Sequence, residues 1–175
     1  MGFSAKEGLY MALSHNEMKV LELVYEDSRI KPAQAAVMLG MTEEEVKAAI
    51  AKLEDEKVIV GYPALVNWDK TPIEKVKAVI EVKVTPQRDM GFDAIAARIY
   101  RFDEVKEVYL MSGAYDLMLE VQADNMRTLA NFVSQKLSTI DNVLSTATHF
   151  VLKKYKVDGV ILEEEHADGR LAVSP

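Results

Sequence analysis

The chain has 175 residues, 49% of them hydrophobic and 28% charged, and its 28 acidic residues against 21 Lys plus Arg give a net charge of −7. This composition is typical of a soluble globular protein of one or two domains. The absence of Cys excludes a disulfide framework and a cysteine-ligated zinc site. The longest apolar stretch, 58–66, is too short to span a bilayer, and no secretory signal pattern opens the chain, so we expect a cytoplasmic protein without membrane contact.

Three short helices are predicted in the first third of the chain. They follow a tail at 1–13, in which the apolar residues show neither a helical nor a strand spacing. A capping-box spacing followed by apolar residues at helical intervals predicts a helix over 14–27. Pro32 suits the first turn of a second helix, and Gly40 suits its end. A second capping box, opened by Thr42, predicts the third helix. This order, with a tight turn before the third helix, is a helix-turn-helix pattern.

A wing and a boundary are predicted after the third helix. The residues 57–62 have the pattern of a strand that enters a turn, and 63–68 could return as its partner. Polar residues before a proline at 69–72 favour extended backbone and indicate a domain boundary.

The second half of the chain contains both segments in which apolar and polar residues alternate, as in strands, and segments with apolar residues at helical spacing. We predict strands at 73–85, 105–110, 117–121 and 143–155, and helices at 89–101 and 126–137. The order β-α-β-β-α-β is the ferredoxin-like unit, an antiparallel sheet with both helices on one face. Its other face needs cover, which is a physical argument for a homodimer.

The predicted fold class is therefore α+β. The domains are a winged helix-turn-helix domain over 1–70, a ferredoxin-like domain over 71–158, and a polar C-terminal tail over 159–175.

Several segments in this order resemble the Lrp/AsnC family of transcriptional regulators over residues 14–156. The strongest match is 112–117, Ser-Gly-Ala-Tyr-Asp-Leu, which is similar to the family's Gly-x-Tyr-Asp signature; 29–30, 53–62 and 143–148 add to it. The resemblance implies a DNA-binding regulator that assembles as dimers and octamers and binds a small effector, often an amino acid, between subunits. It implies no cofactor.

The third helix is the candidate for reading the major groove. Its apolar stripe turns Glu44, Ala48, Ala51 and Asp55 outward. The candidate DNA-binding residues are Lys31, Thr42, Glu44, Lys47, Ala48, Ala51 and Lys52, with Lys57 as a further phosphate contact. For each lysine, the alternative is a solvated partner of a neighbouring glutamate, and for Thr42 it is a helix cap.

The charge of this helix departs from the family pattern. Family members usually carry Arg or Lys at the positions that match Ala48, Ala49 and Ala51, whereas 43–57 holds six acids against three lysines. Lys and Arg supply most of the nonspecific affinity for DNA. DNA binding is therefore either weak and dependent on avidity between several domains, or lost.

The turn at 112–116 is the candidate effector site. An amino acid needs a carboxylate for its ammonium group and backbone N–H groups for its carboxylate. Asp116 supplies the carboxylate, and small residues before it allow close approach. The candidate effector-binding residues are Ser112, Gly113, Ala114, Tyr115, Asp116, Thr146 and Thr148. The alternative is a tight hairpin turn in which Asp116 bonds its own backbone.

The sequence thus favours a ligand-responsive DNA-binding transcriptional regulator whose effector is an amino acid or a similar small metabolite. Its expected partners are DNA, copies of itself and that effector. The alternative is an oligomeric sensing or protein-interaction module with weak or lost DNA binding. An enzyme is not expected, because no nucleophile elbow, phosphate loop or paired carboxylates occur. No metal site or catalytic residue is expected.

Overall fold

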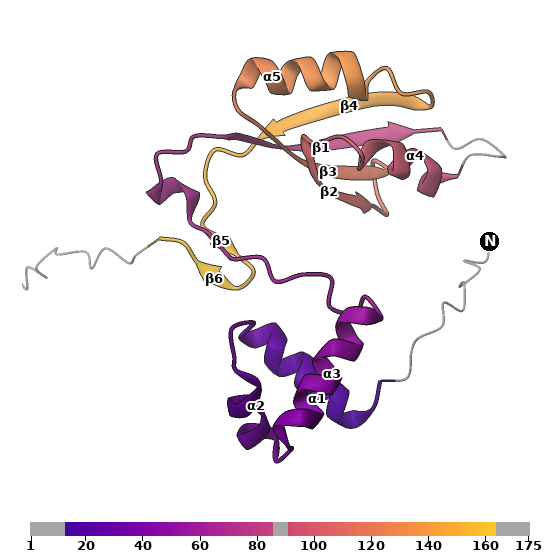
Figure 1. Ribbon diagram of the computed structural model, residues 1–175. Coiled ribbons are helices and arrows are strands. Elements are labelled where there is room, and N and C mark those ends of the chain that lie inside the picture. The colour runs from indigo at the N-terminus through magenta and orange to yellow at the C-terminus, as the bar shows by residue number, and fades with distance from the viewer. Residues whose placement is uncertain (1–12, 86–90, 164–175) are drawn as a thin grey trace, which may run out of the picture. The chain divides into compact units, whose positions relative to one another are not determined.

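The computed structural model describes residues 13–85 and 91–163. The chain divides into two compact units between Ala64 and Leu65 (Figure 1). The predicted tail before Leu13, the first residues of the helix predicted at 89–101, and the tail after Glu163 lie outside the described residues. None of the helices within these ranges combines the length and the apolar character that a membrane crossing requires.

The first unit consists of three helices in the predicted order: α1 (His15–Glu26), α2 (Pro32–Leu39) and α3 (Glu43–Asp55). Complete capping boxes begin α1 at Ser14 and α3 at Thr42, and Gly40 ends α2 with a left-handed φ of 66°. The core is formed by small and branched side chains: Val20, Val24, Ala35, Ala36, Val46, Ala49 and Leu53. The helix-turn-helix prediction is confirmed.

The wing strands predicted at 57–62 and 63–68 are wrong, because no strand lies between α3 and residue 76. Lys57 takes a positive φ of 59° and turns the chain back. The next two N–H groups, of Val58 and Ile59, both donate to the carbonyl of Leu53 and close the end of α3. Pro63 has no N–H to offer a ladder, and the apolar run at 58–60 has no partner strand within the described residues.

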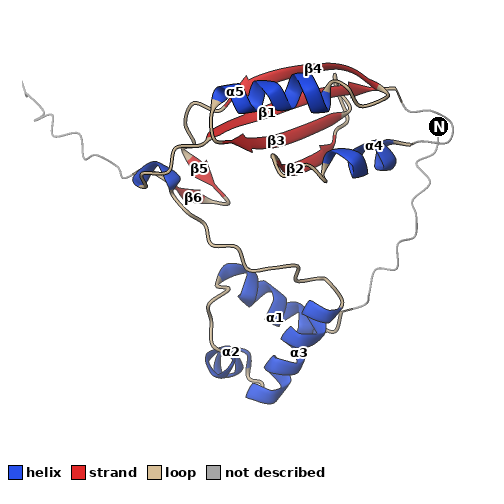
Figure 2. Ribbon diagram, turned by 45° about the horizontal axis from the view of Figure 1, so that its top comes forward, coloured by secondary structure: helices blue, strands red, loops and turns tan. Residues whose placement is uncertain are grey.

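The second unit contains a four-stranded antiparallel sheet in the order β2-β3-β1-β4, with two helices on one face (Figure 2). Its elements are β1 (Val76–Val84), α4 (Phe92–Ile99), β2 (Val105–Leu110), β3 (Leu117–Ala123), α5 (Met126–Asn131) and β4 (Val143–Phe150). The helix α5 continues as a π-helical segment, η2 (Phe132–Leu137). This is the predicted ferredoxin-like arrangement.

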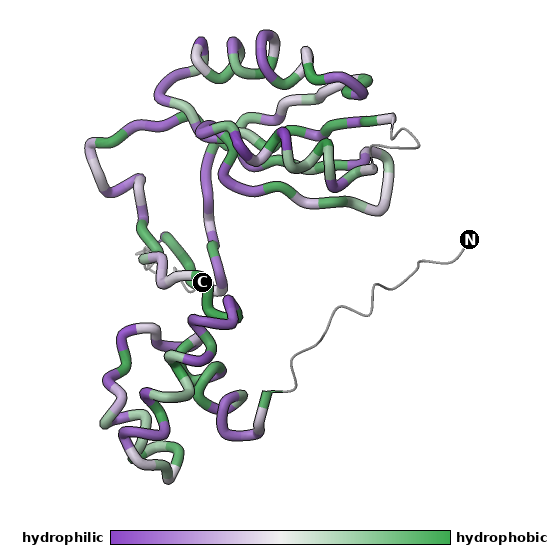
Figure 3. Tube along the Cα trace, turned by 45° about the vertical axis from the view of Figure 1, so that its right-hand side comes forward, coloured by the Kyte–Doolittle hydropathy of each residue, from purple (hydrophilic) through white to green (hydrophobic). Residues whose placement is uncertain are grey.

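Alternation along the central strands decides which face of the sheet is covered. Every second residue of β3, beginning at Leu117, is buried, and the same holds for β1 from Ala78. These residues form one cluster with the inner side chains of α4, α5 and η2: Ile95, Ile99, Leu129, Phe132 and Leu137. The alternation can be followed along the chain in Figure 3. The opposite face, with Val79, Glu81, Met118 and Glu120, is half-buried and carries neither described helix.

The last long strand ends at Phe150, five residues before the predicted end. The strand β4 runs antiparallel to β1, so its hydrogen bonds stop where β1 begins. The last of them is donated by the N–H of Val151 to the carbonyl of Lys77, near the start of β1. A small hairpin follows that the sequence did not suggest, β5 (Lys156–Val157) with β6 (Val160–Ile161). The amide of Asn67 donates to the carbonyl of Leu162 over 2.9 Å, so the segment that precedes β1 is attached to this hairpin.

Candidate functional site

The outer face of α3 presents small and acidic side chains to solvent. Glu44, Ala48, Ala51 and Asp55 are all exposed, as the helical spacing predicts. Ala49 is buried in the core of the first unit, with 7% of its surface exposed. Its methyl group therefore packs inside the unit and is not part of the exposed face of α3.

Both lysines that flank this face are held by glutamates. The Nζ of Lys47 lies 2.6 Å from Oε1 of Glu43, and that of Lys52 lies 2.7 Å from Oε1 of Glu17 and 3.9 Å from Oε1 of Glu56. The hydrogen bonds to Glu43 and Glu17 raise the pKa of Lys47 and Lys52 respectively. Exposed ion pairs of this kind contribute little stability and can exchange partners.

Lys31 and Lys57 complete the set of candidate phosphate contacts. Both side chains are exposed, and neither forms an ion pair with another residue in the described ranges. Lys31 precedes α2, and Lys57 stands at the turn that follows α3. They are thus better placed than Lys47 and Lys52 to meet an anion without first losing a glutamate.

The beginning of α3 is closed by its own side chains. The Oγ1 of Thr42 accepts from the N–H of Glu45 over 3.2 Å, and the N–H of Thr42 donates to Oε2 of Glu45 over 2.8 Å. The carboxylate of Glu45 takes the place that an external phosphate would need. The geometry corresponds to the cap interpretation of Thr42.

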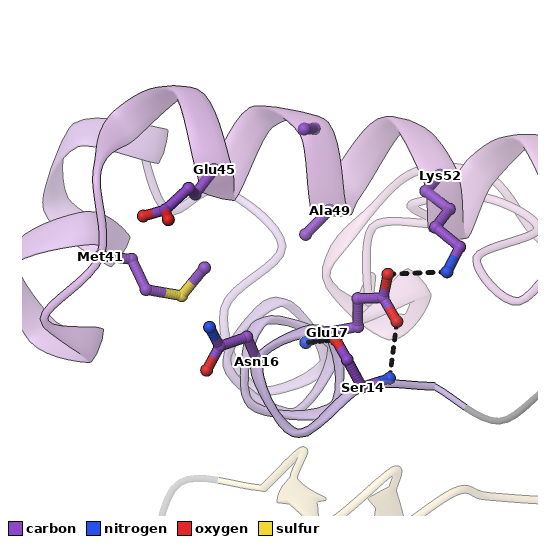
Figure 4. Close-up of a pocket in the computed structure, with 8 residues that line it drawn as sticks. Ser14, Asn16, Glu17, Met41, Glu45, Ala49 and Lys52 are labelled. Carbon is purple, nitrogen blue, oxygen red and sulfur yellow. Dashed lines mark hydrogen bonds and ion pairs between the residues drawn. The ribbon is translucent and has the colours of Figure 1, made fainter.

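An open pocket lies between the start of α1 and α3 (Figure 4). Its lining residues are Ser14, Asn16, Glu17, Met41, Glu45, Ala48, Ala49 and Lys52. Glu17 connects the two helices here, because one oxygen accepts from the N–H of Ser14 over 2.7 Å while the other accepts from Lys52. Glu17 therefore helps to position α3 against α1. The sequence predicts the capping-box spacing from Ser14 to Glu17, but not the contact of Glu17 with Lys52, since that contact joins positions 35 apart. The pair of Lys47 with Glu43, four residues away, is the glutamate partner expected from the sequence as the alternative for each lysine.

These contacts predict a pH dependence of the first unit. The bond from Lys52 is the main cause of a lowered pKa for Glu17, and the backbone of Thr42 lowers the pKa of Glu45. A carboxyl whose folded pKa is lowered stabilises the fold above its unfolded pKa, near 4.5, and the contribution is lost as pH falls below that value. We expect hydrogen exchange of the α1 and α3 amides, measured by mass spectrometry, to quicken relative to its intrinsic rate between about pH 5 and pH 3.

The variants Glu17→Gln and Glu22→Gln provide the comparison. Glu17→Gln retains an oxygen for the N–H of Ser14 but removes the ionisable partner of Lys52, so the pH dependence should become smaller. Glu22 is exposed on the same helix and makes no ion pair among the described residues, so its variant should behave as wild type. Equal pH dependence in all three proteins would contradict the assignment to Glu17.

The turn at 112–116 is tied to the sheet through Asp116. Its N–H donates to the carbonyl of Val82 over 3.1 Å, and its Oδ2 accepts from the N–H of Val84 over 2.8 Å. The pairing of β1 with β4 shifts between Lys83 and Val84. The carboxylate of Asp116 therefore accepts from the N–H of Val84 at the point where the pairing of β1 with β4 is irregular. The bond runs to another strand, and not to the turn's own backbone.

The residues before Asp116 leave the turn open. Ser112, Gly113 and Ala114 are exposed, and Tyr115 is half-buried. Gly113 has no positive φ, and a Cβ at its position would meet no atom within 4 Å. Neither turn geometry nor packing within the described chain requires glycine here. The absence of a side chain leaves backbone accessible to a ligand or to another chain.

Thr146 and Thr148 are separated from this turn by β1. They pair with Val82 and Ile80, and they share the sheet face that the helices cover. Two strand spacings amount to roughly 10 Å. The structure thus brings the residues 112–116 together, but it does not place the two threonines beside Asp116 within one protomer.

Comparison with known proteins identifies both units. A family model for winged helix-turn-helix DNA-binding matches residues 13–60, and one for the Lrp/AsnC ligand binding domain matches residues 77–161. An HTH-type transcriptional regulator of Bacillus subtilis, YugG, is 51% identical over 166 residues, which cover 94% of this chain and 100% of the relative. The chain belongs to the Lrp/AsnC family of transcriptional regulators. It is a ligand-responsive, DNA-binding regulator with an α+β fold, and the helix-turn-helix occupies its first unit.

Two further comparisons bear on this Lrp/AsnC protein. The leucine-responsive regulatory protein of Rhizobium meliloti is 30% identical over 140 residues, covering 80% of this chain and 89% of the relative. The feast or famine regulatory protein of M. tuberculosis, solved in complex with L-methionine, has a TM-score of 0.68 and 22% identity, covering 87% of this chain and 100% of that one. At 22% identity, the similarity to the M. tuberculosis protein shows a shared fold.

Within the described residues, no group of three or more His, Asp or Glu side chains is arranged to hold a metal ion. Four carboxylates of the first unit take part in helix caps or ion pairs: Glu17, Glu43, Glu45 and Glu56.

Proposed function

We propose that a free amino acid is the effector of this regulator and that it binds at the turn 112–116. The observation that carries the proposal is the half-buried Asp116, whose carboxylate is bonded to β1 and which follows the open backbone of Gly113 by three residues. It offers an anion for an ammonium group, while the neighbouring backbone offers N–H donors for a carboxylate. The amino-acid complex of the M. tuberculosis relative supports the choice of ligand class.

DNA binding is proposed to depend on the outer face of α3 and to be weak for a single domain. Both lysines beside that face already have carboxylate partners, so a phosphate contact by Lys47 or Lys52 must first displace Glu43 or Glu17. Weak domains bind tightly when an oligomer presents several of them to one duplex. A protein that works on DNA belongs in the compartment that holds the DNA, and we propose the cytoplasm.

The open face of the sheet is the proposed surface for self-association. Val79 pairs with Glu120 and Glu81 with Met118, so apolar and acidic side chains alternate across the two central strands on that face. These side chains are half-buried without a covering helix. A second copy of the same sheet would cover them and form a homodimer, from which larger assemblies can grow.

A salt titration of DNA binding tests whether α3 contacts phosphate, with full-length protein and duplex genomic fragments. Glu43→Gln releases Lys47 and should add one phosphate contact. We expect an affinity about eightfold higher at roughly 0.1 M salt, and a slope of log K against log salt steeper by about 0.9.

Glu22→Gln provides the matched control, because it changes the net charge equally but lies on α1 without an ion pair among the described residues. It should leave the slope unchanged. Equal effects of the two variants would argue against α3 as the contact surface. No retention of DNA by wild type even at low salt would favour the alternative, a sensing module with lost DNA binding, which the paired lysines and the acidic α3 also suggest.

A further inference from the structure

The face that α3 offers to a duplex is made of two methyl groups and carboxylates. Glu44, Ala48 and Ala51 are exposed on one stripe and are flanked by the paired lysines. From Glu44 to Ala51 the helix rises about 10 Å, which corresponds to roughly three base pairs at 3.4 Å each. The first residues of a recognition helix are the ones that reach base edges.

Each of these side chains suits a particular base. The carboxylate of Glu44 makes no hydrogen bond or ion pair with another described residue. It can only accept, and in the major groove the N4 amino group of cytosine is the donor that Glu and Asp read. The methyl groups of Ala48 and Ala51 match the 5-methyl group of thymine.

Guanine is disfavoured at the same positions. It presents the acceptors N7 and O6, which a carboxylate repels and which Arg or Lys usually contacts. The helix α3 contains no Arg, and its two lysines are paired with glutamates.

We propose that α3 reads pyrimidines along one strand of its half-site, cytosine through Glu44 and thymine methyl groups through Ala48 and Ala51. The inference rests on the proposed function in one respect, that the outer face of α3 meets DNA. It goes further by assigning base specificity to three residues.

A selection from randomised duplexes with the full-length protein gives the base preference directly. We expect cytosine and thymine to be enriched at adjacent positions on one strand. Replacing each enriched thymine by deoxyuridine removes only the methyl group and should weaken binding about fourfold per methyl. Glu44→Gln should reduce the preference for cytosine at its position by about tenfold or more.

Asp55→Asn is the matched control. Asp55 lies on the same exposed stripe, but it is the last residue of α3, and its loss changes the charge equally. It should raise affinity for all duplexes alike through reduced repulsion of phosphate, without altering base preference.

The possible outcomes distinguish a failure of DNA reading by α3 from a failure of the proposed base specificity alone. Enrichment of no duplex would overturn DNA reading by α3 and this inference with it. Enriched sites that tolerate deoxyuridine, or whose base preference is the same in wild type and Glu44→Gln, would overturn the inference and leave the proposed function standing.

Discussion

Asp116→Asn should abolish the response to an amino-acid effector while the fold remains close to wild type. The amide oxygen of Asn can still accept from the N–H of Val84, whose bond to Asp116 measures 2.8 Å. The negative charge that would bind the ammonium group is lost. At a concentration 100 times its Kd, a ligand stabilises the wild type by about 2.7 kcal/mol, and this shift should be absent from the variant. Thermal unfolding without ligand measures the stability of the variant, and thermal unfolding with a panel of free amino acids measures the stabilisation by the effector.

Asp116→Ala distinguishes the structural bond from the binding role. It leaves the N–H of Val84 without its acceptor, which costs about 1–3 kcal/mol for a buried donor, and it should also fail to respond to the effector. Asp124→Asn is the control, because Asp124 follows β3 at its other end and is exposed. It should respond as wild type. A full response from Asp116→Asn would move the effector site elsewhere, and a panel without any stabilising amino acid would contradict the ligand class.

Leu53→Ala should remove most of the folding stability of the first unit and leave the second unit unchanged. Leu53 is 0% exposed and packs in the cluster that joins α1, α2 and α3. Truncation of a buried leucine costs about 2–5 kcal/mol. A folded unit of roughly 50 residues has about 3–8 kcal/mol of stability in total. Most of that margin is therefore removed.

Hydrogen exchange read by mass spectrometry checks this result for each unit separately. The amides of 15–55 should lose most of their protection, while those of β1 and β3 keep it, and DNA binding should weaken while the amino-acid response remains. Leu152→Ala, at a side chain that is 96% exposed, should change neither unit. Loss of protection in β1 as well would show that the two units fold together.

The elements that the sequence predicts well are those fixed by local chemistry. The capping boxes of Ser14 and Thr42 and the glycine at position 40 set helix ends through contacts within a few residues. Alternation along β1 and β3 reports which face is buried, because successive side chains point to opposite faces.

The elements that it predicts poorly depend on partners distant in sequence. The pattern at 57–62 is that of a strand, but a strand needs a neighbour, and the residues that the structure describes provide none there. The end of β4 is fixed by the start of β1.

The same holds for the candidate sites. The exposure of Ala48 follows from helical spacing, whereas the bond from Val84 to Asp116 joins positions 32 apart and could not be read from the sequence. The separation of Thr146 from the turn depends on strand order, because β1 lies between β3 and β4.

The π-helical segment at the end of α5 has a consequence for changes in chain length. A wider turn holds more residues per repeat than an α-helix, and here it keeps Phe132 and Leu137, five residues apart, both in the core. Deleting the exposed Ser134 would bring these two side chains to the four-residue interval that suits an ordinary α-helix. The same deletion within α4 would rotate every later side chain by about 100° away from the sheet. The end of α5 is therefore a place where, unlike in α4, a helix of this unit can lose one residue and keep its inner side chains in the core.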